Sequence, residues 1–480
     1  MTITDRCRVG RSAIDVLSDD VLICIFNLYR QDLEFQIHSH SDSESWSWHP
    51  WRTLVHVCQR WRHIIFAWPN HLDIRIKCRS RTAAAKALDV WPTLPIGIRS
   101  ILKDDDPDGD IIAALEHRVR IAEVDLSGLS GPQLESCVAL MQANFPMLRI
   151  LSLGCDAETT TLVIPDTFLG RCAPRLRNVN LSHVPFPTLP KLLLSASHLV
   201  ELHLEEIPTT GYISPEAMAT CLAVLTRLQS VTIRSPFWRS FPQNQTNQNP
   251  PPMSRAVLSS LTKLKFGGVS GEYLDDLMAR IHLPRLNDLY LQFFPQPTFG
   301  VPKVPQIVHR IDTFKPPFQA VVYIYDNSTD ISVFSPGRGR LGLEFQCTES
   351  DNQLSWLTRI FPQLLPLLSQ INYLELFDHD AQDDQDSTLW LEFLRPFSAV
   401  KTLCFHDQNS LKQIARVLGE LTDEGAAAVL PMLDTIMWFD KTYWDPVWDP
   451  VKSWLFPIVQ PFVDARQLLG HPVVVKSRCP

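Results

Sequence analysis

The feature that most constrains the fold is a short apolar pattern that recurs along most of the chain. An apolar residue is followed by others three and five positions later, the spacing LxxLxL, and eleven copies occur. Because alternate residues of a β-strand point to opposite faces, each copy places one face of a short strand in a core. The copies are Ile121/Val124/Leu126, Leu148/Leu151/Leu153, Leu176/Val179/Leu181, Leu199/Leu202/Leu204, Leu228/Val231/Ile233, Leu261/Leu264/Phe266, Leu286/Leu289/Leu291, Phe318/Val321/Tyr323, Ile371/Leu374/Leu376, Val400/Leu403/Phe405 and Leu433/Ile436/Trp438.

Most successive copies lie 23 to 33 residues apart, and the one gap of 53, from Tyr323 to Leu376, holds a degenerate strand at Arg340–Cys347. One strand cannot bury its own apolar face, so the copies must stack. The period predicts an α/β solenoid, an irregular leucine-rich-repeat horseshoe over residues 71–440. Two earlier strands, Leu72–Ile76 and Ile96–Ile98, flank the helical stretch TAAAKALDVW and extend the array toward the N-terminus.

Two segments interrupt the repeats. Residues 241–253, FPQNQTNQNPPPM, are rich in Asn, Gln and Pro and predict a solvated loop. The run from Pro295 to Pro317 contains six prolines. These predict an irregular turn of the solenoid without regular helix.

The strand period also predicts where a target binds. If the apolar positions point inward, the third, fifth and seventh positions line the concave side, where repeat proteins generally bind. These positions are acidic early and aromatic late, as a bipartite site needs, and the selected candidates are Glu201, His203, Glu205, Tyr290, Tyr373 and Phe377. Alternatively, a Trp-rich capping segment, residues 441–480, covers the later aromatic residues.

A different block precedes the array. After residues 1–12, expected to be disordered, Ser18 can cap a helix whose apolar stripe includes Val21 and Phe26. A polar loop, about residues 31–50, separates it from a second helix, in which Leu54, Val57, Cys58, Trp61, Ile64 and Ile65 form one continuous stripe that Pro69 ends. Inside that stripe Cys58 acts as a small hydrophobe rather than a metal ligand. Such a small hairpin cannot hide both stripes, and leftover apolar surface usually marks a partner.

Together, LSDDVLICIF and LVHVCQRWRHIIFAWP resemble the F-box, here over residues 13–70, and the continuation into LDIRI and WPTLPIGI looks like fungal F-box proteins with degenerate leucine-rich repeats. Ser18 stands where that family usually has proline. The resemblance implies a substrate receptor of an SCF-type ubiquitin ligase, which binds a Skp adaptor, and through it a cullin, and holds an unknown target protein on the repeats. The adaptor contacts implied are Leu17, Val21, Leu22, Ile25, Phe26, Leu54, Val57, Cys58, Trp61 and Pro69. Contact with a partner and local core remain alternatives for this stripe, and a scaffold outside any ligase is the alternative function.

Other classes of function find little support. A net charge of −8 disfavours nucleic acid as the main partner. Eleven cysteines without a CxxC pair indicate reduced thiols in the cytoplasm or nucleus, and no apolar run approaches the roughly 18 residues that span a membrane. The acidic stretch Asp104–Glu116 lacks the closing glutamate of a calcium loop, since Leu115 occupies that position. The sequence GRGRLG, Gly337–Gly342, continues into a strand, which favours turn glycines over a dinucleotide site. We therefore expect no metal, no cofactor and no catalytic residues of the chain's own.

Overall fold

The computed structural model describes residues 13–38, 50–68, 76–78, 94–99, 108–155, 162–235, 255–268, 271–293, 304–314, 317–325, 328–337, 339–346, 353–378, 387–406, 408–421, 424–439 and 450–478. Several predictions made from the sequence lie outside these ranges. They concern residues 1–12, 39–49 of the polar loop, Pro69, 72–75 of the first early strand, the helical stretch 82–91, Asp104 to Asp106, the loop 241–253 and the segment 441–449.

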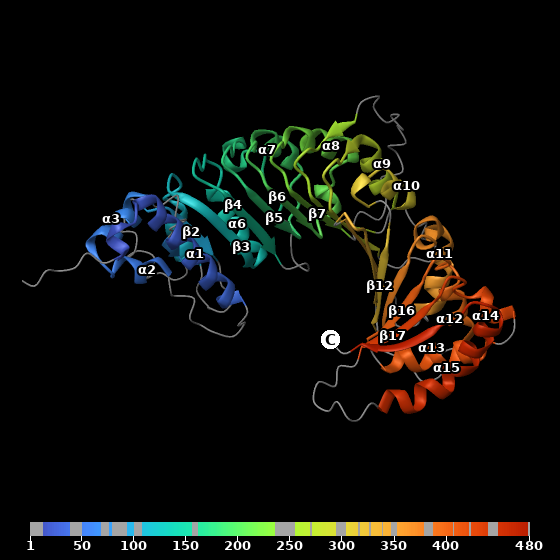
Figure 1. The fold of residues 1–480 in the computed structure, drawn as a ribbon. Coiled ribbons are helices and arrows are strands. Elements are labelled where there is room, and N and C mark those ends of the chain that lie inside the picture. The colour runs from blue at the N-terminus through green and yellow to red at the C-terminus, as the bar shows by residue number, and fades with distance from the viewer. Residues whose placement is uncertain are drawn as a thin grey trace, which may run out of the picture.

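One sheet of sixteen strands forms the body of the protein and curves into an arch, with helices along its outer side (Figure 1). Its strands, in spatial order, are β1 (Ile76–Cys78), β2 (Ile96–Arg99), β3 (Ile121–Leu129), β4 (Ile150–Cys155), β5 (Asn178–Ser182), β6 (Glu201–Glu205), β7 (Ser230–Ser235), β9 (Lys263–Gly268), β11 (Asp288–Phe293), β14 (Arg340–Gln346), β13 (Ser328–Phe334), β12 (Gln319–Tyr325), β15 (Tyr373–Asp378), β16 (Thr402–Phe405), β17 (Thr435–Phe439) and β18 (Val474–Arg478). All pairs are parallel except those that β13 makes. The predicted solenoid-like α/β fold is therefore present.

A regular backbone ladder joins the successive strands. The amide of Val200 donates to the carbonyl of Arg177 at 2.7 Å, and the amide of Gln229 donates to the carbonyl of Val200 at 2.8 Å. The same bond recurs one strand further on, from Thr262 to Gln229 at 2.9 Å. Each repeat therefore holds the next in the same way, as expected of a stacked array.

The ladder changes at β13, which the sequence pattern did not predict. Strands β12, β13 and β14 form a meander, and the sheet joins it through β14 to β11 on one side and through β12 to β15 on the other. Both outer pairs are parallel, so β13 alone runs against the rest of the sheet. The degenerate strand predicted at residues 340–347 is β14, but it precedes β12 in space.

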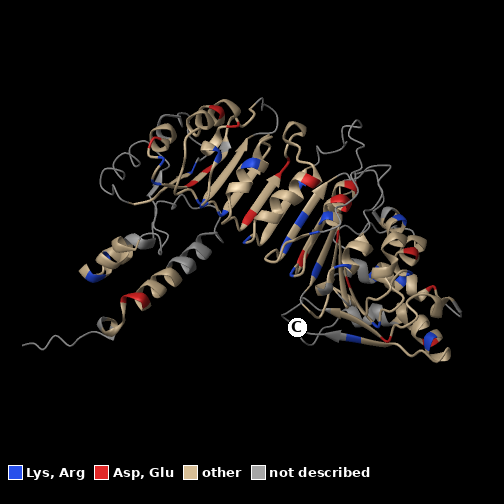
Figure 2. Cartoon of the chain, turned by 90° about the horizontal axis from the view of Figure 1, so that it is seen from above, with Lys and Arg blue, Asp and Glu red and all other residues tan. Residues whose placement is uncertain are grey.

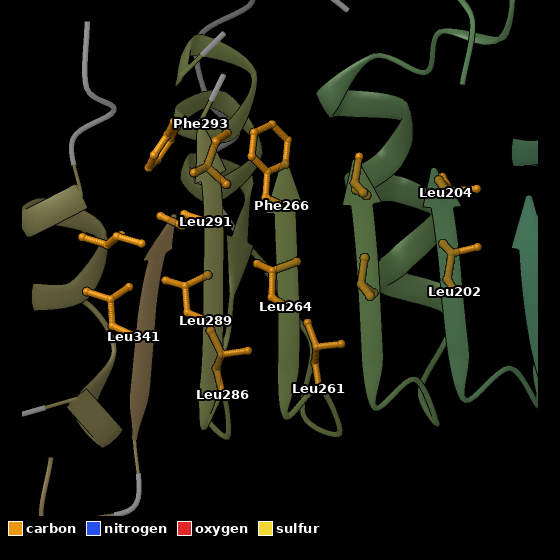
Figure 3. Packing of buried hydrophobic residues seen from close by; sticks show 14 of the residues in the cluster. Leu202, Leu204, Leu261, Leu264, Phe266, Leu286, Leu289, Leu291, Phe293 and Leu341 are labelled. Atoms are coloured by element: carbon orange, nitrogen blue, oxygen red, sulfur yellow. The ribbon is translucent and has the colours of Figure 1, made fainter. Parts of the chain in front are cut away.

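The core is a continuous cluster of buried side chains that runs from Leu22 to Val473. In ten of the eleven copies, the predicted apolar positions are buried. Figure 3 shows Leu264 and Phe266 of β9 beside Leu289 and Leu291 of β11. The sequence pattern therefore located this part of the core correctly.

The prediction for the copy Phe318/Val321/Tyr323 was wrong by one residue. In β12 the side chains that join the core cluster are Ala320, Val322 and Ile324, whereas Phe318 is 46% exposed and Tyr323 is half-buried. Val321 is buried at 6% exposure but lies outside that cluster. Both alternations along this strand are apolar, so the period alone could not choose between them. A shift of one residue turns every side chain to the opposite face.

The helices on the outer side are α5 (Asp108–Leu115), α6 (Gly131–Leu140), α7 (Leu189–Ser195), α8 (Pro215–Val224), α9 (Gly271–Arg280), α10 (Val304–His309), α11 (Gln353–Leu368), α12 (Ser387–Leu394), α13 (Gln408–Gly419), α14 (Glu424–Ala428) and α15 (Pro450–Leu468). Helix α8 begins where Ser214 caps it and Pro215 takes the first position, which suits proline because its missing N–H has no partner there anyway. Helix α10 corrects the prediction of no regular helix among the prolines. Pro305 lies in its first turn, where proline is tolerated.

The C-terminal segment extends the sheet as well as covering its end. Strand β18 pairs in parallel with β17, and α15 packs on α13 and α14. Arg466 of α15 is 1% exposed and donates to the carbonyls of Pro431 at 3.1 Å and Leu433 at 2.8 Å. Val459 and Phe462 are buried beside it in the same core cluster.

Candidate functional site

The N-terminal block consists of α1 (Asp19–His38), α2 (Pro50–Val55) and α3 (Gln59–Ala67). Helix α1 begins after Ser18, as predicted, but it continues through residues 31–38, which were expected to belong to a polar loop. That stretch, QDLEFQIH, contains no Gly or Pro to end the helix. The second helix was predicted as one piece and is two, since the chain turns at residues 56–58.

The structure corrects the predicted position of Cys58 within one continuous helix. It is exposed and forms the N-cap of α3, where its Sγ accepts a hydrogen bond from the amide of Trp61 at 3.4 Å. It is therefore not a buried hydrophobe within a continuous stripe. Val57, placed in the same stripe, is 56% exposed in the turn.

The predicted adaptor contacts divide into buried and exposed residues. Leu22, Phe26 and Leu54 are buried in the core of the chain, which favours local core, the alternative left open for this stripe, over contact with a partner. Leu17 and Trp61 are half-buried, and the Trp61 ring lies 4.7 Å from that of Phe26.

The exposed residues on α1 form a second stripe, which we call the hairpin patch: Val21, Ile25, Leu28 and Tyr29. Their spacing of four, three and one places them on one side of the helix. Their exposed fractions are 43%, 41%, 65% and 37%. Leu28 and Tyr29 were absent from the predicted contacts, although the same period would have included them.

Arg60 holds the start of α1 against α3. Its guanidinium donates to the carbonyl of Leu17 at 2.6 Å and to Asp19 Oδ1 at 2.7 Å. Arg62 donates to the carbonyl of Val55 at 3.0 Å. These contacts fix the orientation of α1, and with it the hairpin patch, relative to α2 and α3.

The second candidate surface is the face of the sheet that points away from the helices. Along β6 the exposure alternates, so that Glu201, His203 and Glu205 lie on this face while Leu202 and Leu204 point into the core. Figure 2 shows basic and acidic segments side by side on the strands of the sheet. The predicted acidic early face is therefore interrupted by basic residues.

A cavity of about 410 Å³ lies on this face across β6, β7, β9, β11 and β14, and we call it the central pocket. Its lining includes three predicted residues, His203, Glu205 and Tyr290. It also includes Gln292, a predicted concave position outside the selected candidates, and three residues that sequence reasoning missed, Arg234, Lys265 and Glu344. Arg234 and Lys265 occupy seventh and fifth positions of their repeats, so the pattern contained the signal.

Tyr290 is held inside this pocket rather than offered as a free aromatic surface. Its hydroxyl donates to Glu344 Oε2 at 2.5 Å. Its ring lies over Gly342 of the neighbouring strand, where an added Cβ would meet Tyr290 Cδ2 at 2.4 Å. Burial, and then the bond to Glu344, raise the pKa of Tyr290 far above its ordinary value, so it remains a neutral donor.

The later aromatic positions form a separate group, the aromatic row: Tyr325, Tyr323, Phe377 and His406. The Phe377 ring stacks on Tyr323 at 4.4 Å and on His406 at 4.2 Å. His406 Nε2 also lies 3.2 Å from Glu375 Oε2. Only Phe377 of this row was predicted to bind a target. The predicted register of β12 was off by one residue, so Tyr323 and Tyr325 were not recognised as residues of the concave face.

Tyr373 and Glu201 lie outside both groups. Tyr373 begins β15 in register with Gln319 and Thr402 and is half-buried. Glu201 accepts a hydrogen bond from Asn178 Nδ2 at 2.6 Å. The structure thus brings together half of the six predicted target contacts.

Among the described residues, no group of His, Cys, Asp or Glu side chains is arranged to hold a metal ion. In the same part of the chain, no helix is long and apolar enough to cross a membrane. The GRGRLG stretch leads into β14, as the interpretation as turn glycines requires.

Comparison with known proteins gives little more. No family model matches the chain, and no curated protein matches it. Among solved structures, a "Crystal structure of TLR13-ssRNA13 complex" is similar over 81% of this chain and 49% of its own, with 12% identity and a TM-score of 0.28. The chain therefore spans about half the length of that structure, and so distant a likeness carries no argument about function.

Proposed function

We propose that this protein is an interaction receptor, and specifically the substrate-receptor subunit of an SCF-type ubiquitin ligase. In this proposal the helices α1 to α3 bind a Skp adaptor, which connects to a cullin, and the concave sheet face holds the protein to be ubiquitinated. The chain performs no chemistry of its own. The F-box resemblance of residues 13–70 motivates the choice of adaptor.

The observation that carries the proposal is the hairpin patch. Helix α1 has two apolar stripes, and only the one with Leu22 and Phe26 is buried within the chain. The other leaves Leu28 with 65% of its surface in water. Contiguous exposed apolar side chains on one helix face usually mark a protein interface.

Co-purification tests the proposal. The full chain is co-expressed with a Skp adaptor, as wild type and as the double variant Val21→Ser/Ile25→Ser. Leu194→Ser is the matched control, because Leu194 of α7 is likewise exposed and apolar, at 48%. We expect the wild type and the control to retain the adaptor, and the double variant to lose it.

The alternative is a repeat scaffold that acts outside any ligase. It shares the concave face but gives the hairpin patch no adaptor. Failure of the wild-type chain to retain the adaptor would remove the ligase proposal and favour the scaffold. Equal retention by the double variant would move the adaptor site away from the hairpin patch.

A further inference from the structure

The central pocket has an unequal supply of hydrogen-bond donors and acceptors. Its two carboxylates are already bound within the chain. Glu205 Oε1 accepts from Arg234 Nη1 at 2.9 Å. Glu344 accepts from the Tyr290 hydroxyl at 2.5 Å and from Gln292 Nε2 at 3.0 Å.

The basic side chains of the pocket, in contrast, have donors to spare. Arg234 Nε is buried and has no hydrogen-bond partner among the described residues. Lys265 is exposed, and its ammonium lies 5.8 Å from the centre of the Tyr290 ring, a cation–π contact that uses none of its hydrogen-bonding capacity. Within the described ranges, no carboxylate pairs with Lys265. A ligand cannot reach the buried Arg234 Nε itself, but the Arg234 side chain is 35% exposed beside exposed Lys265, so the pocket favours a ligand that brings acceptors.

The shape of the pocket depends on a glycine. At Gly267, an added Cβ would lie 2.9 Å from Arg234 Cγ and 3.1 Å from Gln292 Oε1. The missing side chain therefore lets Arg234 and Gln292 approach each other across β9. A larger residue there would push the arginine out of its place.

The net charge of the lining favours a singly charged anion, such as a carboxylate, over a doubly charged one, such as a phosphate. Arg234 and Lys265 supply two positive charges, and Glu205 and Glu344 supply two negative charges. His203, also in the lining, lies 3.9 Å from Glu201 on its own strand. A balanced pocket accommodates a single negative charge better than a double one, because like charges repel at close range.

We propose that the central pocket binds the carboxylate of an Asp or Glu side chain in a target segment, with Lys265 and Arg234 as its donors. This rests on the proposed function, in which the concave face holds a target. It assigns the acidic residue to the target and the basic residues to the receptor, opposite to the acidic face that the sequence suggested.

Peptide selection tests the assignment without knowledge of the target. The probe is a pool of random peptides, blocked at both ends, with Glu, Gln or phosphoserine fixed at the centre. The full chain captures peptides from the pool as wild type, as Lys265→Gln and as Lys263→Gln. Lys263 is the matched control, since it is an exposed lysine of the same strand and lies outside the pocket lining.

We expect the wild type and Lys263→Gln to enrich Glu peptides over Gln peptides. Lys265→Gln should reduce that enrichment by roughly tenfold, the effect of losing one charge-assisted hydrogen bond. Equal capture of Glu and Gln peptides, or equal loss in the two lysine variants, would overturn the proposal. So would a Lys265-dependent preference for phosphoserine over Glu.

The same experiment separates this proposal from the proposed function. If peptides bind without a preference for Glu, the concave face remains a receptor and the pocket loses its assigned chemistry. If no peptide binds at all, the target-holding role of the concave face fails as well. Adaptor binding, measured separately by co-purification, is affected by neither result.

Discussion

Replacing Gly342 with alanine should reveal how tightly the sheet packs around Tyr290. The added Cβ would lie 2.4 Å from Tyr290 Cδ2, whereas ordinary contacts begin at 3.4 Å. The ring must therefore retreat by about 1 Å. Its 2.5 Å hydrogen bond to Glu344 cannot keep its geometry after such a shift.

The size of the effect follows from two opposing contributions. Losing a hydrogen bond to a charged group costs about 1.5–3 kcal/mol. Alanine in place of a strand glycine returns about 0.5–1 kcal/mol, because glycine loses more backbone freedom on folding. Gly342→Ala should therefore destabilise this region by about 0.5–2.5 kcal/mol. In a chain that already carries Tyr290→Ala, the same change should stabilise it, since the ring is absent.

The assay is a double-mutant cycle read by hydrogen exchange of β11 and β14, which reports local opening even where a long array does not unfold as one unit. The reversal of sign between the two backgrounds is the critical result. Equal effects of Gly342→Ala with and without the Tyr290 ring would show that the close approach does not determine the packing.

Three further changes have distinct expected outcomes. Arg466→Met should accelerate hydrogen exchange in β17 and β18 but not in β4, since it removes donors to buried carbonyls at one end of the array; uniform acceleration would contradict this. Leu28→Ser should weaken adaptor binding by about 1–2 kcal/mol, because Leu28 is 65% exposed and full burial of a leucine provides about 1.5–3 kcal/mol. Leu22→Ala should instead cost about 2–5 kcal/mol of folding stability, because Leu22 is buried in the core. Calorimetric titration measures the first effect and thermal unfolding the second. Burial raises the pKa of Cys221 to about 11, so its thiolate is scarce and alkylation at mildly alkaline pH should modify exposed Cys172 well before Cys221, as peptide mass spectrometry can measure.

The repeat pattern predicted most of the sheet because burial on one side of a strand leaves a period of two in the sequence. It could not place β12, where Val321 and Val322 are both apolar and both buried, and only tertiary packing puts Val322 rather than Val321 in the core cluster. Nor could it show the meander. Strand order depends on contacts between segments far apart in the chain, and no local pattern records them.

The exposure of the candidate contact residues was predicted less well than the sheet, for two physical reasons. A helical stripe shows which residues are apolar but not which part of the stripe its own domain covers, so Leu22 and Leu28 look alike in the sequence. At Cys58, the turn depends on a side-chain cap that the periodicity does not show. The basic residues of the central pocket could have been found, since Lys265 stands at a predicted concave position.

The reversed strand β13 has a consequence for how the protein folds. Most neighbouring strands of the sheet join segments close together in the chain, but β11 must find β14 across a separation of 52 residues, as in the contact between Gln292 and Glu344. The hairpins within the meander are local and need little loop closure, so they can form first and present a ready surface to both sides. We therefore expect growth of the array from the N-terminal side to pass β11 only after the meander has formed. On this expectation the two parallel runs of strands fold as separate modules, joined by a segment that forms on its own.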